Sequence, residues 1–298
     1  MPMASTRSGL TLAYDTTGSP DDPPLLLVSG LGTQLLSWDE GLCALLADAG
    51  RYVVRFDNRD AGLSTSFDDR PVDVAAVFRA MADGDVATAR SLVPYDLSDM
   101  ALDAVELLDS LGIDRAHVVG ASMGGMIAQT MAIEHPTRVA TLTSIMSTTG
   151  DGAVGQPSPD ALGALLGPVP TSRDEAIERS VQTSKVIGSP GYPYAEADLR
   201  AYAGADFDRS FHPAGMARQL AAVVTQPDRT VALSTLNVPT LVVHGADDPL
   251  VDPSGGRATA NAVPGAQLKI VPGMGHDIPP ALYGEIVASL VENFALNN

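Results

Sequence analysis

The sequence predicts an α/β protein with a mostly parallel central sheet flanked by helices. Segments with helical periodicity alternate along the chain with short apolar segments of strand length, an arrangement that favours parallel strands. The run at 24–28 is continuously apolar, as expected for a strand that is buried on both faces. Apolar residues make up 45% of the 298 residues and charged residues only 18%, so the chain can fill a large core.

The first half of the chain begins with strand signals. Residues 10–14 alternate as a half-exposed strand does, and the turn-forming residues 18–23 end that strand. After the strand at 24–28 comes a glycine-containing turn, and Ser37 is then the expected N-cap of a helix through Leu46. There follow a strand at 52–56, a polar loop at 57–64, poorly defined helical residues at 68–94 and a helix at 98–111 capped by Gly112.

The second half repeats the alternation around one interruption. Strands are expected at 117–119, 139–146, 238–243 and 266–271, and helices at 126–133 and 280–294. From about 148 to 230 the composition changes to glycine, proline and short amphipathic pieces without buried-strand signals. We therefore expect a sheet-containing core of residues 1–147 and 231–298, with a helical cap of residues 148–230 inserted over the carboxyl edge of the sheet.

The charge and cysteine content exclude several classes of function. A net charge of −18 repels nucleic acid and anionic membranes, and neither is expected as a partner. Cys43 is the only cysteine, so no disulfide within the chain or multi-cysteine metal site is expected. No run is long enough to span a bilayer, and residues 1–11 lack the apolar segment of a secretory signal. We expect a cytoplasmic protein; whether it is a monomer or a homo-oligomer is left open.

A Gly-x-Ser-x-Gly motif lies at 120–124, between an apolar strand and a helical segment. A serine at such a sharp turn has strained backbone angles, and glycines two residues before and after it remove Cβ atoms that would collide with the neighbouring elements. The following helix N-terminus favours developing negative charge. Ser122 is therefore the candidate nucleophile.

A serine hydroxyl needs a base, and the base needs an orienting carboxylate. Of the five histidines, His276 alone follows a strand in a glycine-rich loop that lets the imidazole reach the sheet edge. The strand ending at 243 delivers Asp247 and Asp248 to the same edge, and either could orient the base. The backbone N–H groups of Leu31 and Met123 are the candidate oxyanion hole, because one follows an early strand and the other follows the nucleophile.

These motifs resemble those of the α/β-hydrolases, in particular the single-domain, cap-bearing serine esterases. The resemblance covers about 1–147 and 231–298 and rests on Gly-Ala-Ser-Met-Gly-Gly at 120–125, His-Pro-Thr-Arg-Val at 135–139, Gly-Ala-Asp-Asp-Pro at 245–249 and Gly-Met-Gly-His at 273–276. The order serine, aspartate, histidine is that of the family. The family's Gly-x-x-Asp pattern falls on Asp248, which we therefore prefer as the acid. Within the family the chain most resembles the aclacinomycin methylesterase group.

Two positions depart from the family's patterns. The family often has His-Gly before the oxyanion residue, where this chain has Ser29 and Gly30. The loop at 57–64 resembles the family's Asp-x-Arg-Gly-x-Gly-x-Ser, with Asp60 in place of a glycine. We expect this loop to be structural, so the change at Asp60 should not alter the chemistry.

Hydrolysis of a small-molecule carboxylic ester through an acyl-enzyme is the expected reaction, with no cofactor and no metal. Carbon–carbon bond hydrolysis, thioester hydrolysis and cofactor-free perhydrolysis on the same residues are alternatives, and so is a non-catalytic small-molecule sensor. A serine in the Gly-x-Ser-x-Gly motif argues against the chemistry of the family's dehalogenases and epoxide hydrolases, which have an aspartate nucleophile at this position. The candidate substrate-binding residues are Trp38, Tyr192, Tyr194, Phe211 and Met216, with Phe207 and His212 also available in the cap.

Overall fold

An eight-stranded sheet forms the centre of the computed structural model, which describes residues 1–297. Its order is β1-β2-β4-β3-β5-β6-β7-β8; β2 pairs antiparallel with β1 and β4, and the remaining pairs are parallel. The strands are Met3–Ser5 (β1), Thr11–Thr17 (β2), Pro24–Val28 (β3), Tyr52–Phe56 (β4), Ala116–Ala121 (β5), Val139–Ile145 (β6), Thr240–Gly245 (β7) and Gln267–Val271 (β8). The predicted fold class, a mostly parallel sheet between helices, is confirmed.

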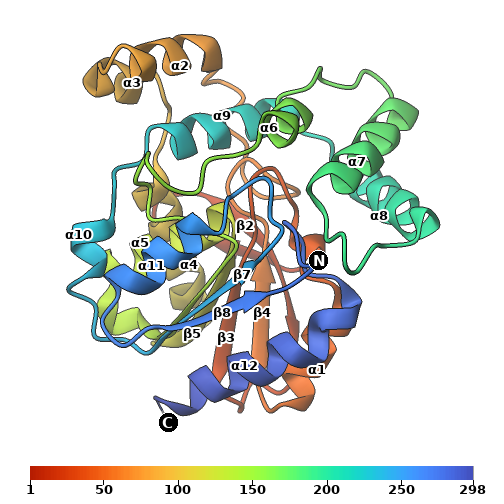
Figure 1. Ribbon diagram of the computed structural model, residues 1–298. Helices are drawn as coiled ribbons and strands as arrows, with labels where there is room; N and C mark the ends of the chain where they lie inside the picture. The colour runs from red at the N-terminus through yellow and green to blue at the C-terminus, as the bar shows by residue number, and fades with distance from the viewer. Residues whose placement is uncertain (298) are drawn as a thin grey trace.

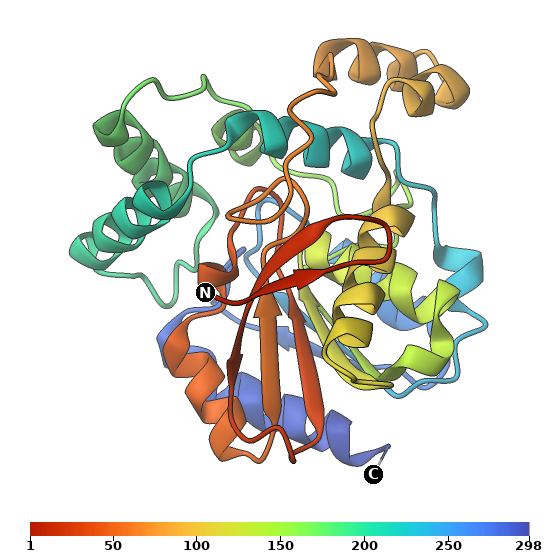
Figure 2. The same cartoon turned by 180° about the vertical axis from the view of Figure 1, so that it is seen from behind.

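Helices cover both faces of the sheet (Figures 1 and 2). The α-helices are Glu40–Asp48 (α1), Val74–Ala82 (α2), Val86–Ser91 (α3), Leu97–Ser110 (α4), Met123–Glu134 (α5), Pro159–Leu165 (α6), Arg173–Ile187 (α7), Glu196–Arg209 (α8), Pro213–Val224 (α9), Thr230–Leu233 (α10), Ser254–Ala262 (α11) and Tyr283–Ala295 (α12). Short 3-10 helices span Leu35–Ser37 (η1), Pro136–Arg138 (η2) and Pro280–Leu282 (η3). Within residues 1–297, no helix is both long and apolar enough to cross a membrane.

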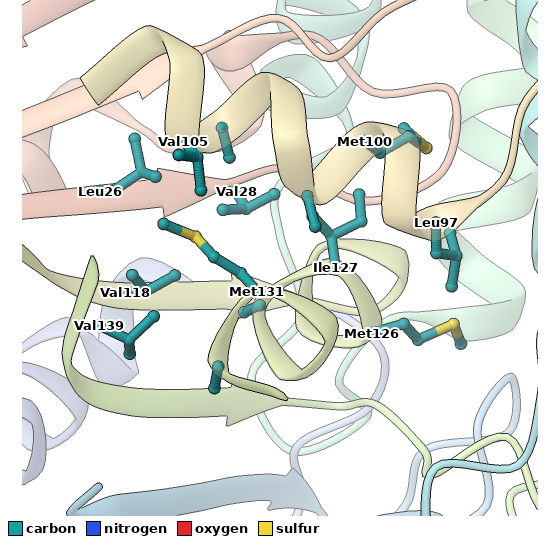
Figure 3. Close-up of a cluster of buried hydrophobic side chains, with 14 of the residues drawn as sticks. Leu26, Val28, Leu97, Met100, Val105, Val118, Met126, Ile127, Met131 and Val139 are labelled. Carbon is teal, nitrogen blue, oxygen red and sulfur yellow. The ribbon is translucent and has the colours of Figure 1, made fainter. Parts of the chain in front are cut away.

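The two faces of β3 belong to two different hydrophobic clusters. Leu26 and Val28 pack with α4 and α5 on one face, where Met100, Ile127 and Met131 join them (Figure 3). Leu25 and Leu27 pack with α1 and α12 on the other face. Because side chains alternate along a strand, a strand covered on both sides must be apolar throughout, which explains the continuous apolar run.

The helices α6, α7, α8 and α9 lie above the carboxyl ends of the parallel strands, and α2 and α3 lie beside α9 (Figures 1 and 2). The first group, α6 to α9, falls within the predicted insertion at 148–230. The poorly defined segment at 68–94 forms α2 and α3, separated by Gly84 with φ +75°. A small cluster that includes Val77 of α2 and Ala221 of α9 packs these segments together.

The helix start predicted at Ser37 is wrong. Ser37 ends the 3-10 helix η1, and its hydroxyl donates to Ser29 Oγ at 3.3 Å. The N-cap of α1 is Asp39, whose carboxylate accepts from the N–H of Gly41 at 2.8 Å. Either side chain can cap a helix, but the intervening 3-10 turn moves the first α-helical residue to Glu40.

Candidate active site

Ser122 lies at the junction of β5 and α5, in a strained backbone conformation with φ 56° and ψ −121°. The glycines of the motif permit the close packing around it. A Cβ at Gly120 would lie 2.0 Å from the carbonyl oxygen of Gly124, and one at Gly124 would lie 2.0 Å from that of Val28. The Ser147 hydroxyl donates to the Ser122 carbonyl at 2.8 Å. The predicted sharp turn at Ser122 is therefore held by its neighbours on several sides.

The side chains of Ser122, His276 and Asp248 form one hydrogen-bonded chain. His276 Nε2 lies 2.9 Å from Ser122 Oγ, and His276 Nδ1 lies 2.8 Å from Asp248 Oδ2. An ionised carboxylate can only accept, so Nδ1 carries the proton and donates a hydrogen bond to Asp248. In the neutral imidazole, Nε2 is then free to accept the proton of Ser122. The structure thus brings together the three side chains that the sequence singled out.

The Asp248 carboxylate is buried and fully engaged. Its Oδ1 accepts from the N–H groups of Leu250 and Val251, each at 2.9 Å. His244 Nε2 lies 3.4 Å from Oδ2 and 2.7 Å from the Val251 carbonyl oxygen. Burial raises the pKa of Asp248. The positive charge that His276 carries when it is protonated, together with the hydrogen bonds from His244, His276 and the Val251 N–H, lowers the pKa by more, so it lies below the ordinary value. Asp248 is therefore ionised at neutral pH.

Asp247, the alternative acid, has a different environment. Its Oδ2 accepts from the N–H of Gly273 at 2.8 Å, and its own N–H donates to the Met274 carbonyl at 3.0 Å. The side chain is exposed, whereas that of Asp248 is buried beside the imidazole. Asp247 thus ties β7 to the loop that bears His276 and does not bond the imidazole itself.

The turn after β3 lies directly against Ser122. A Cβ at Gly30 would be 3.4 Å from Ser122 Cβ, and Gly32 has φ +66°. Within residues 1–297, neither the N–H of Leu31 nor that of Met123 donates a hydrogen bond to another protein group. Two backbone donors, one at this turn and one at the start of α5, therefore have no protein acceptor, as is required of the donors of an oxyanion hole.

Two of the five candidate substrate-binding residues pack against the loops that surround Ser122 and His276. Met216, on α9, packs on the turn after β3, since a Cβ at Gly32 would be 2.8 Å from its Cγ. Tyr192 packs beside the loop of His276, with Cε2 3.4 Å from a Cβ built on Gly273.

The other three candidates occupy different surroundings. Trp38 is 2% exposed and packs in the hydrophobic cluster beneath α1 and α12. The Tyr194 hydroxyl donates to the Ile278 carbonyl at 3.0 Å. Phe211 is 42% exposed and its ring centroid lies 4.7 Å from that of Phe207. Protein contacts therefore hold the Tyr194 hydroxyl and the Phe211 ring, whereas the buried indole N–H of Trp38 has no hydrogen-bond partner within residues 1–297.

Sequence reasoning missed several residues that hold the site. The Ser189 hydroxyl accepts from the N–H of Gly275 at 2.9 Å and bonds the Asp277 carboxylate, while the His276 N–H donates to Ile187 at 2.7 Å. These bonds hold the His276 loop from the C-terminal end of α7 and the segment that follows it. Gln219 likewise accepts a hydrogen bond from the N–H of Gly32, in the turn after β3. The partners are far apart in sequence, and no local motif marks them.

No group of three or more histidine, cysteine, aspartate or glutamate side chains that could hold a metal ion occurs in residues 1–297. Cys43 is buried, and this burial raises the pKa of its thiol to about 11. The thiolate is the reactive form, so this cysteine is inert at neutral pH. It is not a candidate nucleophile.

Comparisons with known proteins agree with this geometry. A family model described as the alpha/beta hydrolase fold matches residues 23–184. Rhodomycin D methylesterases from Streptomyces sp. strain C5 and Streptomyces peucetius are each 28% identical, and each match covers 96% of this chain and 95% of the relative. The predicted resemblance to methylesterases is thereby confirmed. A meta-cleavage product hydrolase from Pseudomonas fluorescens IP01 superimposes with a TM-score of 0.73 at 18% identity, over 100% of this chain and 98% of that one. The chain belongs to the α/β-hydrolase fold family.

Proposed function

We propose that the protein is a serine hydrolase that cleaves a small-molecule carboxylic ester through an acyl-enzyme. The observation that carries the proposal is the continuous chain from Ser122 Oγ through His276 to Asp248, with contacts of 2.9 and 2.8 Å. Strained backbone at Ser122 supports it, because such strain is found where a side chain must be held for chemistry. The relatives named as methylesterases make methyl esters the first substrates to test.

The reaction begins with acylation of the serine. Ser122 Oγ attacks the carbonyl carbon of the ester while His276 Nε2 takes the hydroxyl proton. The ionised Asp248 holds the imidazole in the required tautomer and stabilises the imidazolium that forms. The N–H groups of Leu31 and Met123 bind the oxyanion of the tetrahedral intermediate. Breakage of the C–O bond then releases the alcohol, which takes its proton from His276.

Deacylation uses the same groups. A water molecule loses a proton to His276 Nε2 and attacks the acyl carbon, and the Leu31 and Met123 amides bind the second oxyanion. Collapse of this intermediate releases the carboxylic acid and returns the proton to Ser122. The balanced reaction consumes one ester and one water and yields one acid and one alcohol.

We also infer that residues 148–230 act as a cap over the site. Three contacts support this: Met216 lies on the turn after β3, Tyr192 lies beside the loop of His276, and Ser189 bonds Gly275 of that loop. A cap in this position would exclude bulk water and shape the pocket for the substrate.

Active-site labelling tests the proposed function. The wild type should react with a fluorophosphonate at Ser122, and rapid mixing with a p-nitrophenyl ester should release a burst of product equal to the enzyme concentration. Ser122→Ala should lose both signals, whereas replacement of the exposed Ser37 by alanine should retain them. Turnover near background in the wild type, with tight ligand binding that Ser122→Ala leaves unchanged, would contradict the esterase and favour a sensor.

A further inference from the structure

Gln219, on α9, bonds the turn that bears one of the proposed oxyanion donors. Its Oε1 accepts from the N–H of Gly32 at 2.8 Å, and its Nε2 donates to the Arg59 carbonyl oxygen at 2.7 Å. The side chain has no exposed surface. The two partners fix the orientation of the amide, because an N–H can only donate and a carbonyl oxygen can only accept. Gln219 is thus fully engaged between two backbone groups.

Planarity of the peptide bond makes this contact relevant to Leu31. The Leu31 N–H and the Gly30 carbonyl belong to one rigid peptide unit and point in opposite directions. That carbonyl accepts from the Thr33 hydroxyl at 3.1 Å and from the Thr33 N–H at 3.4 Å. The next unit, between Leu31 and Gly32, is held by Gln219. Hydrogen bonds on two successive units therefore set the direction of the Leu31 N–H.

The position of Gln219 is fixed by the contacts that its neighbours on α9 make with the core. The adjacent Arg218 makes two hydrogen bonds to the buried Asp60 carboxylate, at 2.8 and 2.7 Å. One helical turn earlier, Met216 packs on Gly32. Gly32 has φ +66°, so any side chain at this position would be strained and would also meet Met216. The turn and α9 consequently hold each other in one arrangement.

We propose that Gln219 is a positioning residue that aims the Leu31 N–H at the oxyanion. The inference rests on the proposed ester hydrolysis and adds that α9 is a fixed part of the active site. Gln219 touches neither the substrate nor the reacting atoms in this proposal. Its loss should therefore weaken binding of the transition state much more than binding of the substrate.

The test replaces Gln219 by methionine, which has a similar volume and makes neither hydrogen bond. With a p-nitrophenyl ester, kcat should fall by roughly 10- to 100-fold, less than the loss expected from deleting a donor outright, while KM stays within about 2-fold. A trifluoromethyl ketone, which forms an oxyanion on Ser122, should bind more weakly by about the same factor as kcat/KM. Binding of the product acid should be unchanged.

Thr225→Val is the matched control, since this buried residue ends the same helix and its hydroxyl donates to the Ala221 carbonyl at 2.9 Å. Thermal unfolding of both variants separates loss of stability from loss of positioning. A kcat for Gln219→Met no lower than that of Thr225→Val, or a rise in KM alone, would overturn the inference. Failure of the proposed function is a separate result: the wild type would then neither hydrolyse the ester nor bind the ketone.

Discussion

The carboxylate of Asp60 accepts two hydrogen bonds from the guanidinium of Arg218, at 2.8 and 2.7 Å, although the residues lie 158 positions apart. Asp60 also accepts from the Tyr95 hydroxyl at 2.6 Å and from the Phe67 N–H at 2.8 Å. It has φ +65°, a conformation that glycine adopts readily. The aspartate that replaces the glycine typical of this loop therefore has a structural role, because it anchors α9 to the core.

Replacement of Arg218 by methionine should destabilise the protein by about 3 kcal/mol or more, since it leaves a buried carboxylate without its cation. Urea unfolding followed by circular dichroism measures this loss as a shift in midpoint. Arg173→Met is the matched control. Arg173 also makes two bonds, both of 2.7 Å, to one carboxylate, that of Asp208, but this pair is exposed. Its removal should shift the midpoint little.

The double variant Asp60→Gly/Arg218→Met separates the pair from the individual side chains. Glycine accepts the positive φ and removes the buried charge, so the double variant should be more stable than Arg218→Met alone. Equal or greater destabilisation in the double variant would show that the unpaired charge of Asp60 is not the main cost in Arg218→Met. The bonds of Arg218 to Asp68, or those of Asp60 to the Tyr95 hydroxyl and the Phe67 N–H, would then contribute more.

The fold was predictable because its signals are local. The apolar run at 24–28 indicates burial on both faces, and the glycines around Ser122 indicate a turn too tight for side chains. The convergence of Ser122, Asp248 and His276 was also predictable, because each follows a strand of one parallel sheet and the carboxyl ends of such strands share an edge.

The contacts that hold the site were not predictable, because their partners are remote. Gln219 and Gly32 are 187 positions apart, and nothing in the amphipathic pattern of α9 distinguishes this glutamine from a surface residue. Ser189 and Gly275 are 86 positions apart, in loops with no shared motif. The choice between Ser37 and Asp39 as the N-cap of α1 failed for a different reason. Both residue types cap helices, and only the 3-10 turn before Asp39 decides between them.

The neighbouring aspartates provide a second prediction. Asp248→Asn should lower kcat by about 10³- to 10⁴-fold, because an amide that accepts from the Leu250 and Val251 N–H groups turns its NH₂ toward His276 and favours the wrong tautomer. Asp247→Asn should keep kcat within a few-fold, since its side chain bonds the Gly273 N–H and an amide oxygen can still accept that bond. Steady-state kinetics with a p-nitrophenyl ester at pH 8 compares the two.

Correct folding of both variants is the necessary control, and their near-ultraviolet circular dichroism should match that of the wild type. A large loss of kcat in Asp247→Asn, with near-normal turnover in Asp248→Asn, would reverse the assignment of the acid. Similar losses in both would mean that the Asp247 bond to the His276 loop matters as much for catalysis as the carboxylate next to the imidazole.

His117, inside β5, provides a third prediction, on stability. Its Nδ1 lies 3.0 Å from Thr141 Oγ1 and its Nε2 lies 3.4 Å from a guanidinium nitrogen of Arg51. A guanidinium can only donate, so Nε2 accepts and the imidazole is neutral. Burial, and then the charges of Arg51 and Arg115, lower the pKa of His117 from 6.5 to about 4. Protonation in the folded protein would add a buried positive charge beside an arginine.

Between about pH 6.5 and about pH 4 the unfolded chain therefore binds a proton at His117 that the folded protein does not. The contribution of neutral His117 to the free energy of unfolding is therefore complete above this window. It falls by on the order of 2 kcal/mol as the pH drops through the window. In His117→Gln, the amide can still donate to Thr141 and accept from Arg51 but does not titrate. Its free energy of unfolding, measured in urea from pH 7 to pH 4, should fall less steeply than that of the wild type. Equal slopes would mean that other groups cause the loss of stability in acid.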